Sequence, residues 1–274
     1  MKRALFYSAF AVFGAGLAVL GFFIGWGSVG VTAGTRPDET ADISIDPTVY
    51  TTFAPFEPSR TAAPQDPTET PVSTFSPVPG EDEFLVLVNL NNPMYSEPQV
   101  VNISELLTAS NVVCDSRRHA NETAIRALNE MFLAASEAEG CLTFTVASAF
   151  RSLKEQDIIW SSKLSEDPAY GKNGEPLKVM PPACSEHITG LAFDILSPAH
   201  PHSDEGFDRT PEGIWLSENA WRFGFILRYP EDKQDITGVV CEPWHFRYVG
   251  KDAAKYIYEH GLCLEEYLDG LPNP

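Results

Sequence analysis

Two short segments of the chain combine residue types that can hold a metal ion and move protons. The first contains His187 and Asp194, and the second, Glu242-Pro243-Trp244-His245, adds an imidazole and a carboxylate. Two histidines and one aspartate predict a zinc site with three protein ligands and an open fourth position, which is the catalytic pattern, whereas structural zinc sites are closed and rich in cysteine. Zinc at an open position acidifies a water molecule, which becomes a nucleophile near neutral pH.

Glu242 is the predicted general base, because a carboxylate must take the proton of that water and pass it to a leaving amine. Glu242 and His245 lie three residues apart and would face opposite sides of a regular strand. Pro243 interrupts strand pairing and can re-aim one of them. The helical HExxH motif is absent, so the chain is not a thermolysin-like enzyme.

Spacing alone leaves a metal site and a chance arrangement about equally open, since the chain has six histidines. His200 and His202 are rival ligands, although they lie in a polar stretch that predicts a loop. His119 and His260 are expected to be ordinary surface histidines.

A third segment, SAFRSLKEQ, places Arg151 immediately before a predicted helix. Backbone N–H groups and the helix dipole favour anions at such an end. A guanidinium there suits a carboxylate or a developing oxyanion, although a surface salt bridge is the commoner role for an arginine. Gln156, one turn later, could add a hydrogen bond from the same side.

Together, the segments SAFRSLKEQ, SEHITGLAFDI and EPWHFRYVG resemble the zinc D-alanyl-D-alanine carboxypeptidases of the VanY type. Those enzymes group with the D-Ala-D-Ala dipeptidases and the Hedgehog-like fold. The likeness extends over residues 84–268 and includes WRFGFILRYPEDKQDITG between the last two motifs.

The resemblance implies a role for each motif residue. The zinc ligands would be His187, Asp194 and His245, and the general base would be Glu242. Arg151 would polarise the scissile carbonyl and stabilise the oxyanion. The positions that hold the substrate's peptide backbone and terminal carboxylate would be Ser185 and Gln156.

The implied reaction removes the C-terminal D-Ala of a peptidoglycan stem peptide and shortens a pentapeptide to a tetrapeptide. A D,D-dipeptidase or an L,D-carboxypeptidase of the same fold is the alternative, because the chemistry would be the same on another substrate. A non-catalytic wall-binding module is a second alternative, which the complete set of motif residues disfavours.

The elements that must position these segments are predicted within residues 83–274. Apolar patterning predicts strands at 84–88, 141–148, 191–195, 225–229 and 244–249, and helices at 117–139, 153–164, 217–221 and 251–260. Gly140 and Gly261 would end two helices, a Ser152–Glu155 capping box would open another, and Ser217 would cap the fourth. Because no regular βαβ repeat appears, we expect an α+β fold with a central antiparallel sheet flanked by helices.

The N-terminus predicts a membrane anchor. Residues 1–3 contain two basic side chains, and residues 4–31 carry no charge. As a helix this run would be about 40 Å long, more than the roughly 30 Å hydrocarbon core of a bilayer. The positive-inside rule leaves residues 1–3 in the cytoplasm and the rest of the chain outside the cell. Cleavage as a signal peptide after Val31-Thr32-Ala33 remains the alternative.

Residues 34–82 contain nine prolines and few apolar side chains, so we expect a disordered spacer. The formal charge of −19 disfavours nucleic acid as a partner, because phosphate binding needs a basic face. The chain is expected to be a monomer.

Five cysteines, Cys114, Cys141, Cys184, Cys241 and Cys263, lie in the part expected outside the cell, where disulfides persist. Cys184 and Cys241 adjoin the proposed site. A packing role or a disulfide is favoured over a fourth zinc ligand, which would close the catalytic position. Connectivity does not follow from the sequence.

Overall fold

The structure, a computed structural model, describes residues 82–137 and 142–271. The predicted anchor at 4–31 and nearly all of the predicted spacer lie outside these ranges, as do Gly140 and Cys141. No helix within the described ranges is long and apolar enough to cross a bilayer.

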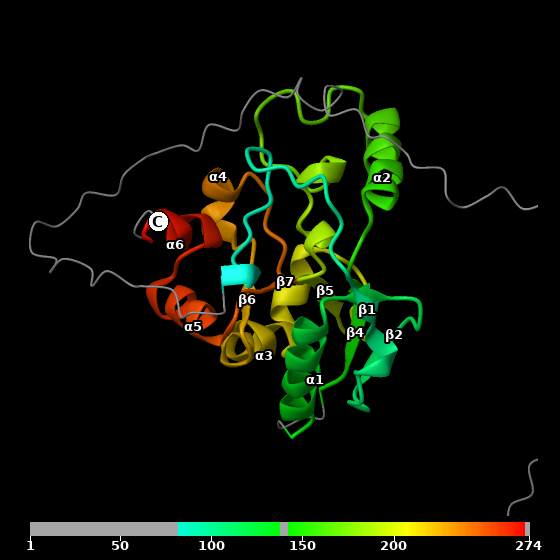
Figure 1. The fold of residues 1–274 in the computed structure, drawn as a ribbon, viewed down its shortest axis with the longest axis vertical. Helices are drawn as coiled ribbons and strands as arrows, with labels where there is room; N and C mark the ends of the chain where they lie inside the picture. The colour runs from blue at the N-terminus through cyan, green and yellow to red at the C-terminus, as the bar shows by residue number, and fades with distance from the viewer. Residues whose placement is uncertain (1–81, 138–141, 272–274) are drawn as a thin grey trace, which may run out of the picture. The chain divides into compact units, whose positions relative to one another are not determined.

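A five-stranded sheet forms the centre of the domain (Figure 1). Its strands, in spatial order, are β2 (Val112–Cys114), β4 (Phe144–Ser148), β5 (Ala192–Leu196), β7 (His245–Tyr248) and β6 (Phe225–Leu227). The predicted α+β class is confirmed. The antiparallel prediction holds for three strand pairs, whereas β2 and β4 are parallel. The chain makes this parallel pair because a helix between the two strands returns it to the same end of the sheet.

That helix, α1 (Glu122–Ser136), begins later than the predicted range of 117–139. The Asn121 side chain accepts a hydrogen bond from the N–H of Ala124 and so sets the start of the helix. Before α1, the short strands β1 (Val101–Asn102) and β3 (His119–Ala120) pair with each other. The apolar face predicted for α1 is buried, and its Phe132 stacks on Phe144 of β4 at 4.9 Å between ring centroids.

The remaining helices are α2 (Leu153–Glu166), α3 (Pro211–Asn219), α4 (Gln234–Thr237), α5 (Lys251–His260) and α6 (Leu264–Asp269). Figure 1 shows α5 and α6 on the side of the sheet where β6 lies and α2 on the side of β4. The predicted capping box of α2 and the bounds of α5 are confirmed. The short helices α4 and α6 were not predicted from the sequence.

The prediction that Ser217 caps a helix is wrong. Thr210 is the N-cap of α3 and Pro211 its first residue, a pair of residue types that favours a helix start. Ser217 lies inside the helix, where its hydroxyl donates to the carbonyl of Ile214 at 2.8 Å.

The predicted strand at 84–88 is also wrong. The chain forms a 3₁₀ turn at Asp82–Phe84 and then runs without a strand partner. The carbonyls of Phe84 and Val86 instead accept hydrogen bonds from the guanidinium of Arg247, at 3.0 and 2.7 Å. A buried side chain thus satisfies backbone groups that a neighbouring strand would otherwise bind.

Short 3₁₀ helices complete the described part, at Ile103–Glu105, Pro182–Cys184, Glu186–Thr189, Glu205–Arg209, Ala220–Phe223 and Glu231–Lys233. The four described cysteines are free. Cys184 is buried in an apolar cluster with Trp160 and Tyr229, which agrees with a packing role.

We expect Gly224→Ala to lower stability more than Gly261→Ala. Both glycines have positive φ, +88° and +62°, so alanine would cost about 1–2 kcal/mol of backbone strain at either position. A Cβ at Gly224 would also lie 2.7 Å from Cε2 of Tyr248 in β7, whereas a Cβ at Gly261 would face open space among the described residues. Overpacking adds roughly 1–3 kcal/mol. Urea unfolding measures the loss of unfolding free energy in each variant. Equal losses in Gly224→Ala and Gly261→Ala would contradict the steric argument.

Candidate metal centre and active site

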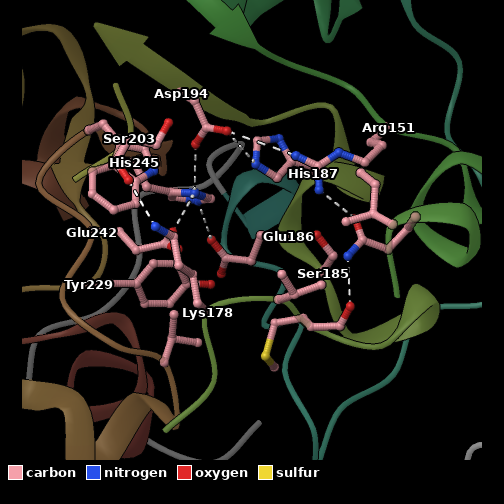
Figure 2. Close-up of a pocket in the computed structure, with 16 residues that line it drawn as sticks. Arg151, Lys178, Ser185, Glu186, His187, Asp194, Ser203, Tyr229, Glu242 and His245 are labelled. Carbon is pink, nitrogen blue, oxygen red and sulfur yellow. Dashed lines mark hydrogen bonds and ion pairs between the residues drawn. The ribbon is translucent and has the colours of Figure 1, made fainter. Parts of the chain in front are cut away.

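One pocket of the described domain brings all seven predicted site residues together (Figure 2). They come from the start of α2, from the 3₁₀ helices before β5, from β5 itself, and from the turn that leads into β7. The residues are Arg151, Gln156, Ser185, His187, Asp194, Glu242 and His245.

The sheet register places a carboxylate beside an imidazole. Asp194 of β5 pairs directly with His245 of β7, and His245 Nδ1 lies 3.2 Å from Asp194 Oδ1. His187 precedes β5 on the Glu186–Thr189 turn, and Gly190, at φ +69°, turns the chain into the strand. His187 Nε2 then lies 3.4 Å from Asp194 Oδ2. One ligand atom from each of the three residues lies within 4.8 Å of the others.

The polar atoms of this cluster fit a divalent cation. His187 Nδ1 lies 2.7 Å from the carbonyl oxygen of Ala149, which can only accept, so Nδ1 carries the proton and Nε2 keeps its lone pair. Asp194 Oδ1 is buried without a hydrogen-bond partner in the described residues. Two imidazole nitrogens and a carboxylate oxygen, with one imidazole oriented by a backbone carbonyl, form a zinc donor set.

The protonation of the cluster follows from its surroundings. Burial lowers the pKa of His187, and the nearby Arg151 lowers it further. Burial acts in the same direction on His245, but the neighbouring carboxylates of Asp194 and Glu186 outweigh it and raise the pKa of His245 to about 9. Burial would raise the pKa of Asp194, yet contacts with His187 and His245 hold it well below its usual range. Asp194 is therefore an anion between two imidazoles.

Glu242 lies against this cluster, with its Oε2 3.4 Å from His245 Nδ1. A turn closed by a hydrogen bond from the N–H of His245 to the carbonyl of Glu242, at 3.0 Å, places both side chains on one side. Pro243 suits the second position of such a turn. Burial raises the pKa of Glu242 to about 8, which brings this carboxyl group into the range of a general base or acid near neutral pH.

Arg151 reaches the cluster from the start of α2. Its guanidinium donates to Gln156 Oε1 at 2.5 Å and to Ser148 Oγ at 3.0 Å, and its Nη2 lies 3.9 Å from Asp194 Oδ2. The amide nitrogen of Gln156 donates to the carbonyl of Met180 at 2.7 Å. Gln156 therefore orients Arg151, and Ser185 lines the same pocket.

The other histidines and the cysteines are not part of this cluster. His200 Nε2 lies 2.8 Å from Asp204 Oδ1 at the surface, and the His202 ring lies beside it. His119 and His260 are exposed, as expected. The metal-binding group found in the described ranges contains no cysteine, so Cys184 and Cys241 are not brought in as a fourth ligand.

Several residues of the pocket were not predicted from the sequence, including Lys178, Glu186 and Tyr229. Glu186 contacts the fully buried Arg228 and Arg247. A signal for it existed, because both arginines lie within predicted apolar strands, and buried cations need a carboxylate partner. Lys178, whose ammonium donates to the carbonyl of Ser203 at 2.9 Å, reaches the pocket through a long-range contact that has no local signal.

Both the sequence and the fold match those of known proteins. A family model described as D-alanyl-D-alanine carboxypeptidase, VanY, matches residues 117–251. The chain is 36% identical over 280 residues to a D-alanyl-D-alanine carboxypeptidase of Enterococcus faecalis, an alignment that covers 98% of this chain and 91% of the relative.

Two solved structures share the fold. The LdcB LD-carboxypeptidase superposes with a TM-score of 0.60 at 36% identity, over 71% of this chain and 90% of that one. A variant of the vancomycin resistance D,D-pentapeptidase VanY in complex with Zn(II) superposes with a TM-score of 0.54 at 36% identity, over 68% of this chain and 99% of that one. From its motifs, its metal-binding geometry and its similarity to the full-length relative, the chain belongs to the VanY family of D-alanyl-D-alanine carboxypeptidases.

Proposed function

We propose that this protein is a zinc-dependent D,D-carboxypeptidase that removes the C-terminal D-Ala of peptidoglycan stem peptides. The observation that carries the proposal is the open three-ligand cluster with a buried carboxylate, Glu242, and a guanidinium, Arg151, in the same pocket. This combination supplies every group that hydrolysis of a terminal peptide bond needs.

His187 through Nε2, His245 through Nδ1 and the carboxylate of Asp194 would hold the zinc ion. These atoms already face one another, and the carbonyl of Ala149 keeps His187 in the required tautomer. When bound, zinc supplies Lewis acidity, which activates water and polarises the substrate carbonyl.

Glu242 transfers the proton. Its buried carboxylate accepts a proton from the attacking water and returns it to the amine of the departing D-Ala. A basic carboxylate suits both steps, because burial raises the pKa of Glu242 to about 8.

Arg151 stabilises the negative charge that develops on the carbonyl oxygen. Its guanidinium is held in place by Gln156 and Ser148 and so needs little reorganisation as the charge forms. Gln156 contributes to substrate binding through Arg151, and Ser185, on the wall of the pocket, contacts the substrate backbone or terminal carboxylate.

The location of the substrate supports an anchored enzyme. Residues 4–31 would form a single membrane span, and residues 34–82 a spacer that holds a monomeric catalytic domain outside the cell. A domain held in this way reaches a polymer that lies just beyond the membrane.

Incubation of the purified, zinc-loaded chain with defined stem peptides tests the activity. We expect a pentapeptide ending in D-Ala-D-Ala to lose one D-Ala and a tetrapeptide to remain intact, both measured by mass spectrometry. Conversion of tetrapeptide to tripeptide would identify an L,D-carboxypeptidase, and cleavage of free D-Ala-D-Ala a dipeptidase. Peptide binding without release of D-Ala would indicate a wall-binding module.

Two variants separate proton transfer from metal binding. Glu242→Gln keeps the shape of the side chain but cannot accept the proton, so turnover should fall roughly 10²–10⁴-fold while bound zinc stays near stoichiometric. His187→Ala removes a ligand, so zinc content and activity should fall together. Bound zinc and released D-Ala are measured on the same preparations. Loss of zinc in Glu242→Gln would make Glu242 a ligand, and full activity would refute the mechanism.

The full-length chain should fractionate with membranes and be cleaved by protease added outside the cell. The uncharged run at 4–31 is the reason for this expectation. A soluble product whose sequence starts at Gly34 would show that the segment is removed as a signal peptide.

A further inference from the structure

A buried charge network lies directly behind the metal-binding cluster. Its centre is Glu186, whose side chain is fully buried next to His187 in the chain. Glu186 Oε1 accepts a hydrogen bond from Arg228 Nε at 2.8 Å and lies 3.0 Å from Arg247 Nη1. Both guanidinium groups are also fully buried, so this carboxylate oxygen is held by two fixed cations.

The second oxygen of Glu186 faces a proposed zinc ligand. Glu186 Oε2 lies 3.8 Å from His245 Nε2, and neither atom has a hydrogen-bond partner among the described residues. The other nitrogen of that ring, Nδ1, lies 3.2 Å from Asp194 Oδ1 within the cluster. The imidazole of His245 therefore spans the distance between the cluster and Glu186 (Figure 2).

We propose that Glu186 is the positioning residue of His245: its carboxylate attracts the Nε2–H by its negative charge, orients the ring and keeps the Nδ1 lone pair free for zinc. A metal-binding histidine commonly donates its second N–H to a carboxylate or carbonyl, which selects the tautomer. His187 follows the same rule with its two nitrogens exchanged: its Nδ1 donates to the carbonyl of Ala149, and its Nε2 is left for the metal. The inference rests on the proposed zinc site.

Arg228 and Arg247 each bind a further group besides Glu186. Glu186 is therefore not needed only to neutralise these two arginines, and its contact with His245 can have a role of its own. Arg228 also binds Glu265 of α6 through both Nη atoms, at 2.8 and 2.7 Å. Arg247 also binds the carbonyls of Phe84 and Val86. The orientation of Glu186 between them leaves Oε2 for His245, and buried ion pairs by themselves contribute little net stability.

Glu186→Gln should reverse the tautomer preference of His245, that is, which of its two ring nitrogens carries the proton. The glutamine oxygen would remain toward the two arginines, which can only donate, so its NH₂ group would face His245 Nε2. This donor favours a lone pair on Nε2 and the proton on Nδ1, the atom that must bind zinc. We therefore expect the zinc affinity of the full-length chain to fall about 10–100-fold, measured by competition with a chelator.

Glu265→Gln is the matched control, because it also removes a carboxylate partner of Arg228 but does not reach His245. It should lower the urea midpoint as Glu186→Gln does, while zinc affinity stays close to that of the wild type. Equal zinc affinity in wild type and Glu186→Gln, or equal losses in both variants, would overturn the role of Glu186. A wild-type chain that binds no zinc would overturn the proposed function with it.

Nitrogen NMR of the imidazoles in the zinc-loaded wild type decides the question even if Glu186→Gln fails to fold. We expect His245 to show a protonated Nε2 and a metal-bound Nδ1, with the reverse assignment for His187. Metal binding through Nε2 of His245 would overturn the proposal.

Discussion

The pairing of three neighbouring strands sets the centre of the site. Ser148 of β4, Asp194 of β5 and His245 of β7 lie opposite one another across the sheet. Because paired residues on adjacent strands lie close together, this row places the carboxylate next to one imidazole without any loop. Ser148, in the same row, accepts a hydrogen bond from Arg151, so the guanidinium is positioned relative to Asp194 and His245. A shift by one residue would turn Asp194 or His245 to the other face of the sheet.

Turns at the ends of these strands then add the remaining groups. Gly190 closes the 3₁₀ turn that carries His187 beside Asp194, and the turn from Glu242 to His245 brings the proposed general base to the cluster. Rigid strands fix the central groups, and short hydrogen-bonded turns fix those at the edge. Such an arrangement is preorganised, which is what electrostatic stabilisation of a developing charge requires.

Three carboxylates in one pocket, two of them buried and Asp194 half-buried, have different properties because their neighbours differ. Burial would raise the pKa of each. Contacts with Arg228 and Arg247 instead hold the pKa of Glu186 well below its usual range, and contacts with His187 and His245 do the same for Asp194. For Glu242 burial dominates, and its pKa rises to about 8. The same chemical group thus serves as a fixed acceptor, a metal ligand and a proton carrier.

Local patterns in the sequence determined the class of the fold, the start of α2, the bounds of α5 and the types of residue in the site. The capping box of α2 and the glycine after α5 act within a few residues, and for that reason the sequence predicts them well. The motif residues were candidates because few residue types can bind zinc or transfer protons, and the resemblance to the VanY-type enzymes assigned their roles. Only the tertiary structure decided that residues 84–88 bind Arg247 instead of a strand, that Glu186 faces His245, and which nitrogen of each imidazole faces Asp194. These outcomes depend on contacts between segments far apart in the chain, and on burial that strengthens them, which no local pattern encodes.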